Sequence, residues 1–265
     1  AMRIFAKFIN CYIHRATYYR FEFIMQFIRD ALMMYCFYAL WKTLFDHGMG
    51  YGGATRLQTI IYGVYSAVLS SFITQENCQD YIYDRILDGT IDADLLKPIG
   101  LQVHMLMRDS AQKITKLIMF TIPTLVIFQL VMRLFYLPSM SDILMFIIST
   151  ILGYGVLFSI NYLFGMLCFY TLTLENINFC YTAVVSFFAG QLVPLWMFPG
   201  WAQRIVNVLP FRCIHDIPMS ILIGRFTTSE VLRVLLLQLT WLVMLWLCGA
   251  LAWRRIRTKV ISQGG

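Results

Sequence analysis

Six apolar stretches, each close to the length needed to cross a bilayer, constrain this chain more than any other feature. A spanning helix needs about 20 mostly apolar residues, and lipid leaves no partner for an unpaired backbone group. The runs are continuous and lack the alternation of barrel strands. The sequence therefore predicts an all-α integral membrane protein with six transmembrane helices. The expected spans cover approximately residues 22–45, 57–75, 114–135, 142–172, 177–198 and 231–253.

The composition agrees with a membrane environment. Of the 265 residues, 59% are hydrophobic and only 13% are charged, whereas a soluble domain carries about 25% charged residues. The mean hydropathy is +0.68. We expect two parts, an amphipathic interfacial helix over residues 1–20 and a six-span transmembrane domain over residues 21–265.

Lysine and arginine set the expected orientation, because they are enriched in cytoplasmic loops. Six spans put both termini on one side, and 13 basic residues fall there against seven on the other. The sequence therefore predicts a multi-pass protein of the cell membrane with both termini cytoplasmic. The first 20 residues lack a cleavage pattern, so we expect no cleavable signal peptide.

The segment 76–100, between the second and third spans, is the expected cytoplasmic coupling segment. It is rich in acid although the whole chain has a net charge of +7. Asp88-Gly89 reads as a helix stop, and Thr90 can cap a second short helix that Pro98 ends. We interpret it as two short amphipathic helices outside the lipid; a solvated loop with little helix is the alternative.

Residues 4–19 carry apolar side chains on one helical face, which favours a helix lying in the cytoplasmic interface. Glu22, Gln26 and Arg29 then share one face of the first span, with Asp30 adjacent. A charge at the bilayer centre costs about 2.5–3.5 kcal/mol on insertion scales. In one interpretation this face lines a polar path or contacts another subunit. In the other, the span starts near Asp30 and this face belongs to a cytoplasmic extension of the helix.

The later part of the chain contains several expected interruptions. Pro123 is expected to kink the third span. The fourth helix is expected to end near Thr173, which leaves Glu175 as the main charge of a short second cytoplasmic turn that contacts a partner or solvent. Four prolines between residues 190 and 224 predict short external, partly re-entrant helices. His215-Asp216 is expected to be an exposed loop pair rather than an acid/base pair.

Motifs that would provide chemistry within the chain are not found. No glycine is followed by lysine, which excludes a phosphate-binding P-loop, and the zinc-protease and serine-hydrolase motifs are missing. The seven cysteines are scattered and indicate neither a disulfide framework nor a metal site. The basic residues are dispersed, so nucleic-acid binding is not expected. We therefore expect no catalytic residue, no metal ligand and no cofactor in this chain.

Four stretches together resemble ABC transporter permeases of the type 2 exporter class, in particular a six-span subfamily whose members are often encoded as pairs. They are R-I-L-D-G-T-I-D-A-D-L-L-K-P-I at 85–99, L-V-P-L-W-M-F-P-G-W at 192–201, L-P-F at 209–211 and I-P-M-S-I-L-I-G at 217–224. The likeness follows nearly the whole chain in order and span count. It is most specific in the first stretch.

The resemblance implies an N-terminal elbow helix, cytoplasmic coupling helices that dock on a separate ATPase, and small external helices. Two ATP-binding subunits, which hold ATP and Mg, would pair with this chain and a second permease, identical or paralogous. Pro199, Trp201, Pro210 and Phe211 would belong to the external helices. The expected ATPase-coupling positions are Asp84, Arg85, Asp88, Gly89, Thr90, Leu95, Leu96, Lys97, Pro98 and, in the second turn, Glu175.

The resemblance implies an exporter that moves a drug, peptide or lipid-like substrate outward, with ATP hydrolysis in a separate subunit. A gradient-driven carrier or channel subunit is the alternative, and it would need an intramembrane ion site built on Glu22 and Arg29. An intramembrane enzyme acting on lipid would need a cluster of His, Asp and Glu at membrane depth, which the sequence does not contain.

Overall fold

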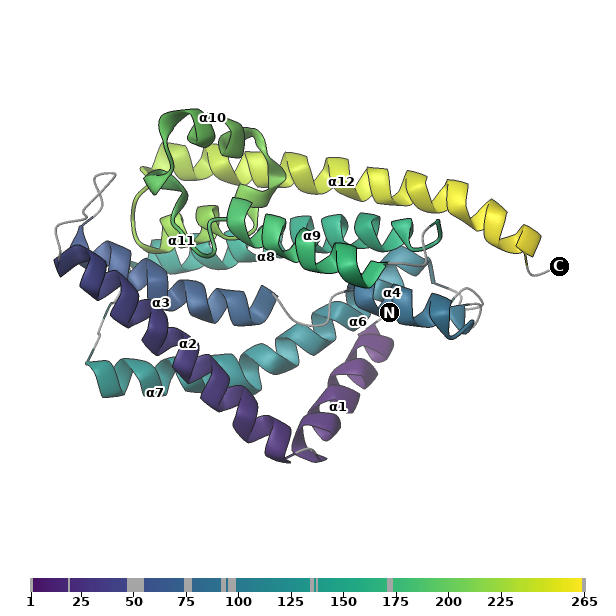
Figure 1. The fold of residues 1–265 in the computed structure, drawn as a ribbon, viewed down its shortest axis with the longest axis horizontal. Helices are drawn as coiled ribbons and strands as arrows, with labels where there is room; N and C mark the ends of the chain where they lie inside the picture. The colour runs from purple at the N-terminus through teal and green to yellow at the C-terminus, as the bar shows by residue number, and fades with distance from the viewer. Residues whose placement is uncertain are drawn as a thin grey trace.

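The computed structural model describes residues 2–18, 20–46, 55–73, 78–91, 94, 99–133, 136, 138–170 and 174–263. Within these residues the regular structure is entirely helical, without a β-strand (Figure 1). The helices are α1 (Met2–Tyr18), α2 (Arg20–Asp46), α3 (Arg56–Ile73), α4 (Cys78–Leu87), α6 (Leu101–Lys116), the π-helical turn η1 (Leu117–Thr121), α7 (Ile122–Met132), α8 (Met140–Leu167), α9 (Leu174–Phe188), the 3-10 turn η2 (Leu195–Met197), α10 (Gly200–Val208), the 3-10 turn η3 (Pro210–Cys213), α11 (Asp216–Leu222) and α12 (Thr228–Gln263).

Three helical segments of the described chain are long and apolar enough to cross a membrane: Leu101–Met132, Met140–Leu167 and Thr228–Ile256. The count rises to four when Gly200–Val208 and Pro210–Leu222, which meet at a 77° bend, are taken as one broken span. The all-helical class that the sequence predicts is confirmed, but its six spans are not. Charged side chains along α2 and the 15-residue length of α9 keep these two helices outside the three clear candidates.

The long helices present apolar side chains to the outside. On α12 a line of exposed residues recurs every three or four positions, which places them on one helical face. It consists of Leu232, Leu236, Leu239, Val243, Leu247 and Leu251, each between 46% and 62% exposed. In water such a stripe would be an aggregation liability; in a bilayer it is the lipid-facing side.

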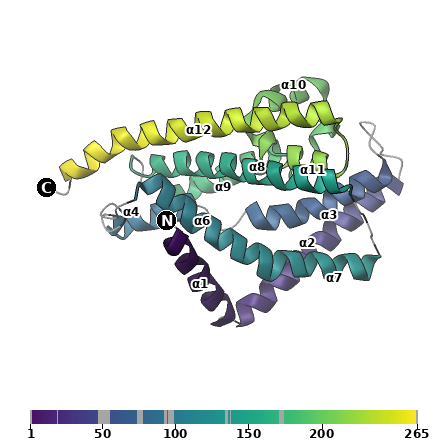
Figure 2. The same cartoon turned by 180° about the vertical axis from the view of Figure 1, so that it is seen from behind.

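The third expected span begins earlier than the sequence predicts, because α6 already starts at Leu101. The π-helical turn η1 separates α6 from α7, and Pro123 is the second residue of α7. Proline lacks the N–H that an upstream carbonyl needs, and π-turns and prolines are the common causes of helix kinks. The two helices accordingly run in different directions in both views (Figures 1 and 2).

Two other helices are shorter than the sequence predicts. α8 ends at Leu167, before the expected limit near Thr173. α9 ends at Phe188, so residues 189–198 do not extend a fifth helix. The chain turns instead at Ala189-Gly190, and three-residue η2 follows. Part of this stretch, Ala189 and Leu195, is buried, whereas Leu192 and Val193 are exposed.

α8 lies at the centre of the bundle, and α12, α11 and α4 pack against it. Its middle residues Val156 and Leu157 join a buried cluster with α11, and its later residues Phe158 and Tyr162 join a second cluster with α4. A third cluster joins α2, α3 and α7. The described bundle thus has two apolar cores that meet along α8 and a further one beside α2.

Elements far apart in sequence gather at the two ends of the molecule. The start of α1, the start of α6, α4 and the last part of α12 lie at one end (Figures 1 and 2). There Ile256 of α12 shares a buried cluster with Cys78 and Ile82 of α4. At the other end lie α10, α11 and the start of α12. Both terminal helices therefore reach the end of the molecule that carries α4.

Candidate functional site

α4 ends where the sequence predicts. The residue after Asp88, Gly89, has a φ of +64°, a left-handed conformation that glycine adopts at little cost. The Gly89 N–H donates to the carbonyl of Ile86 at 3.2 Å, and the Thr90 N–H donates to that of Arg85 at 2.9 Å. These bonds satisfy carbonyls at the helix end, as in a glycine-terminated C-cap. The predicted helix stop at Asp88-Gly89 is confirmed.

The two faces of α4 differ sharply. Cys78, Gln79 and Ile82 are buried against the bundle. Asp84 and Leu87 lie on the outer side, and Leu87 is 53% exposed. An exposed leucine beside carboxylates, on a helix whose other face is fixed, is a surface suited to a protein partner.

Close approach fixes α4 on α8. A Cβ atom placed on Gly165 of α8 would lie 3.1 Å from the Cα of Gln79 and 3.0 Å from Cδ1 of Ile82. Such distances are tighter than ordinary van der Waals contact, so only glycine lets the two helices pack this closely. α4 therefore packs directly against the backbone of α8 at Gly165, and buried apolar side chains add to this contact.

Asn178, near the start of α9, ties α9 to α4. The amide nitrogen of Gln79 donates to Oδ1 of Asn178 at 2.8 Å, and Nδ2 of Asn178 donates to Oδ1 of Asp80 at 2.9 Å. One side chain thus bonds two neighbouring residues of α4. A displacement of α4 would be carried to α9 through these bonds and to α8 through the glycine contact.

A polar cluster surrounds Asp94. This carboxylate is 2% exposed, accepts a hydrogen bond from the Tyr81 hydroxyl at 2.9 Å, and lies 3.6 Å from both Arg85 Nε and His104 Nε2. Arg85 also donates to the Tyr81 hydroxyl at 2.9 Å. That bond, together with the Asp94 carboxylate, raises the pKa of Arg85. The cluster joins α4 to α6, and the His104 ring contacts Phe8 of α1 at 5.7 Å.

The expected coupling residues fall into two groups. Asp84, Arg85, Asp88, Gly89 and Thr90 lie together at the end of α4. The others lie outside the described residues, as does most of the second short helix expected after Thr90. They are Leu95, Leu96, Lys97, Pro98 and the side chain of Glu175. The sequence analysis did not single out Asn178, because its hydrogen bond is to Asp80, which lies 98 positions away in the sequence.

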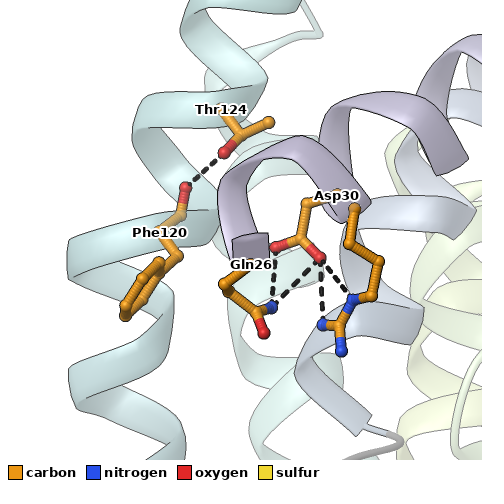
Figure 3. A network of polar contacts seen from close by, with 5 residues as sticks. Gln26, Asp30, Phe120 and Thr124 are labelled. Carbon is orange, nitrogen blue, oxygen red and sulfur yellow. Dashed lines mark hydrogen bonds and ion pairs between the residues drawn. The ribbon is translucent and has the colours of Figure 1, made fainter. Parts of the chain in front are cut away.

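The polar face of α2 centres on Asp30, which the sequence marked only as adjacent. Asp30 is 3% exposed and accepts two hydrogen bonds of 3.1 Å from Gln26. Arg29 donates to it at 3.1 Å and is half exposed. Asp30 and Gln26 lie beside the helix that carries Phe120 and Thr124 (Figure 3). The side chain of Glu22 lies outside the described residues.

The expected external residues separate by environment. Pro199 precedes α10 and Pro210 begins η3, so both prolines stand at helix starts, where a missing N–H costs little. Trp201 is 69% exposed, whereas Phe211 packs against the buried cluster around α11. Short helices are present at these positions, with the Trp201 side chain exposed and the Phe211 side chain packed inward.

His215-Asp216 contradicts the sequence interpretation. The pair was expected in an exposed loop, but His215 is 0% and Asp216 is 2% exposed. Asp216 accepts a hydrogen bond from Nε of Arg212 at 2.9 Å, and its N–H donates to the carbonyl of Ala189. The pair is buried because α11 packs against α8, a contact that local sequence does not reveal.

The described residues contain no group of three or more His, Cys, Asp or Glu side chains placed to hold a metal ion. Their long helices with outward apolar faces instead define a multi-pass membrane protein. The family described as ABC-2 family transporter protein matches residues 31–264. The chain belongs to this family and is a membrane transport component, the permease rather than the ATPase.

Comparisons with curated proteins and with solved structures returned no match. The family match begins within α2, at the residue after Asp30, and continues through α12. Permeases of this family generally work with ATP-binding subunits. α4 and Asn178 therefore lie inside the matched region, whereas Gln26, Arg29 and Asp30 precede it.

Proposed function

We propose that this chain is the permease subunit of an ATP-driven exporter that moves a drug, peptide or lipid-like molecule outward. Two ATP-binding subunits, which hold ATP and Mg, and a second permease, identical or paralogous, complete the transporter. The observation that carries this proposal is α4, a short helix with an exposed outer face that is joined to two helices of the bundle.

The contacts of α4 support a mechanical role. An ATP-binding subunit that docks on Asp84, Leu87 and Asp88 pushes on a helix that cannot move independently. Gly165 transmits the movement to α8 by close contact, and Asn178 transmits it to α9 by hydrogen bonds. Packed elements pass displacements on because protein interiors are dense and resist compression.

The proposed topology has six spans with both termini cytoplasmic in the cell membrane. α2 has 27 residues, or about 40 Å at 1.5 Å per residue, enough to cross a hydrocarbon core of about 30 Å. α3 and α9 would provide the two shorter spans. The start of α1 and the end of α12 lie at the α4 end of the molecule, which supports one common side for these segments.

The test is co-purification of the full chain with an ATP-binding subunit, followed by nucleotide-dependent transport in vesicles. Leu87→Glu places a charge on the outer face of α4. Leu57→Glu is the matched control. Leu57 is 52% exposed, similar to Leu87, but it lies at the start of α3, at the end of that helix away from α4. We expect Leu87→Glu to lower the affinity for the ATP-binding subunit about tenfold, since loss of an interface anchor costs 1–2 kcal/mol or more.

Equal retention of the subunit by both variants would refute docking on α4. Combined substitution of Asp88, Leu95 and Leu96 tests the wider expected surface in the same assay. Transport by the chain alone, without nucleotide, would instead favour a gradient-driven carrier. In that case the buried carboxylate of Asp30 would be the first candidate for an ion site.

A further inference from the structure

A small cavity lies between α8, α9 and the residues just before α11. Its volume is about 20 Å³, enough for one water-sized group. Several of its lining side chains are polar although the surrounding helices are apolar: Asn161, Tyr181, Thr182, Ser186, Gln191 and His215. Polar groups inside a membrane protein are costly, and those that persist mark ligand or ion pathways.

His215 is the most unusual of these residues. Its side chain is fully buried, and neither Nδ1 nor Nε2 has a well-aligned hydrogen-bond partner among the described residues, although the backbone of Ser66 lies near the ring. An unpaired buried polar atom costs roughly 1–3 kcal/mol. The ring is held in place by an edge contact with Tyr62 at 5.9 Å. A fixed imidazole that lines a cavity without a well-aligned partner for either nitrogen is poised to bind a group that enters the cavity.

Other unpaired atoms lie around the same histidine. Nε1 of Trp196 is buried and has no hydrogen-bond partner in the part of the chain that the structure describes, and Oγ of Ser66 and Oδ1 of Asp216 have none of good geometry there. Trp196 contacts Tyr62 at 4.7 Å, and Tyr62 in turn contacts His215. Native proteins leave few buried polar atoms unsatisfied. Their concentration here indicates a polar binding region rather than an ordinary core.

The chemistry of the lining limits the ligand. The described residues that line the cavity include no Asp, Glu, Lys or Arg, so a charged group would be desolvated there without direct contact with an opposite charge. A neutral imidazole donates through one nitrogen and accepts through the other. Because neither nitrogen has a well-aligned partner in the described chain, the best match is a group that can both donate and accept. A hydroxyl group has this property and fits the volume.

We propose that His215 and the adjoining cavity bind the hydroxyl group of an amphipathic molecule whose apolar part lies among the helices. The Tyr181 hydroxyl, which donates to Oδ1 of Asn161, forms part of the wall that α8 and α9 contribute. That such a molecule is cargo rests on the proposed function. Binding itself does not, because the chain can be tested without an ATP-binding subunit.

The test uses the full chain with ¹⁵N-labelled histidine, purified and reconstituted in phosphatidylcholine bilayers. The chain has four histidines, so solid-state NMR assigns the His215 ring signals by their loss in His215→Phe. The probe is 1-decanol, and undecane, of matched length but without a polar group, is the control. We expect 1-decanol to shift the His215 ring nitrogens towards hydrogen-bonded values and undecane to leave them unchanged.

His104→Phe provides a matched variant, because His104 is also buried but lies at the α4 end of the molecule. It should keep both the His215 signals and their response to 1-decanol. If His215→Phe does not fold, replacing the other three histidines assigns His215 by elimination. The proposal is overturned if neither probe or both probes shift the signals. It is also overturned if the nitrogens are already hydrogen-bonded and unresponsive, as a trapped water would make them.

Discussion

Asn178 and Asp80 are joined by a hydrogen bond of 2.9 Å from the amide nitrogen of Asn178 to the Asp80 carboxylate. The bond connects the start of α9 to the helix that we propose as the ATPase-docking element. The same Asn178 accepts a hydrogen bond from Gln79 at 2.8 Å. Its side chain is therefore a direct polar link between α4 and α9.

Replacing Asn178 should weaken this link. In Asn178→Leu the amide of Gln79, a residue only 3% exposed, loses its partner. An unsatisfied buried donor costs roughly 1–3 kcal/mol, so the free energy of unfolding should fall by about that amount in an SDS titration. Asn10→Leu, at an exposed position on α1, is the control and should have little effect. Equal stability of the two variants would show that the bridge contributes nothing.

The close contact between α8 and α4 should not tolerate a large side chain. Gly165→Leu adds atoms where a Cβ alone would already lie 3.1 Å from the Gln79 backbone. Overpacking typically costs about 1–3 kcal/mol, and we expect a loss of this size together with looser attachment of α4, measured as faster proteolysis near residue 88. Gly200→Leu is the control, because nothing lies within 4 Å of its Cβ position.

Two thiols, Cys78 in α4 and Cys168 in the same buried cluster, should resist alkylation. Burial raises the pKa of Cys168 to about 12 and raises that of Cys78 as well. A thiol whose pKa is raised stays protonated and unreactive until the pH approaches that value. Both cysteines should therefore remain unmodified by N-ethylmaleimide at pH 7 and pH 9 in mass spectrometry, whereas exposed Cys11 should react. Labelling of Cys78 or Cys168 as fast as Cys11 would contradict their burial.

Gln26 and Asp30 should be energetically coupled. Gln26 donates to both oxygens of Asp30, and residues in direct contact usually show coupling energies of about 0.5–3 kcal/mol. A double-mutant cycle with Gln26→Ala and Asp30→Ala, read from the free energy of unfolding, should give a value in this range. A cycle between Gln26 and exposed Lys42 should give none. Simple additivity at Gln26 and Asp30 would remove the basis for a structured polar site on α2.

Local patterns were readable from the sequence, and contacts between distant segments were not. The helix stop at Asp88-Gly89 depends on glycine conformation alone, and the short helix α10 depends on prolines and apolar spacing, so both were predicted. The burial of His215 depends on α11 packing against α8, and the position of Asn178 depends on α4. Neither contact leaves a pattern within a few residues of sequence. For this reason the burial of His215 was misread and the role of Asn178 was missed.

The count of six spans is not confirmed, for a related reason. The apolar stretch 177–198 looked long enough to cross the membrane, yet α9 ends at Phe188 and the remaining residues turn back into the bundle. Hydropathy measures how much a segment avoids water, not whether lipid or other helices cover it. The interruption at Pro123 was predicted because the missing N–H of proline acts within one helical turn. The π-helical turn before it has no comparable sequence signal.

The length of α12 has a consequence for assembly. Its 36 residues extend about 54 Å, well beyond a hydrocarbon core of about 30 Å, and its later turns run past α4, where Ile256 touches the same cluster as Ile82. A protein that approaches the outer side of α4 therefore meets the last turns of α12 as well as α4. Its binding cleft must be wide enough for both helices, so shortening α12 should alter the fit even though α4 itself is unchanged.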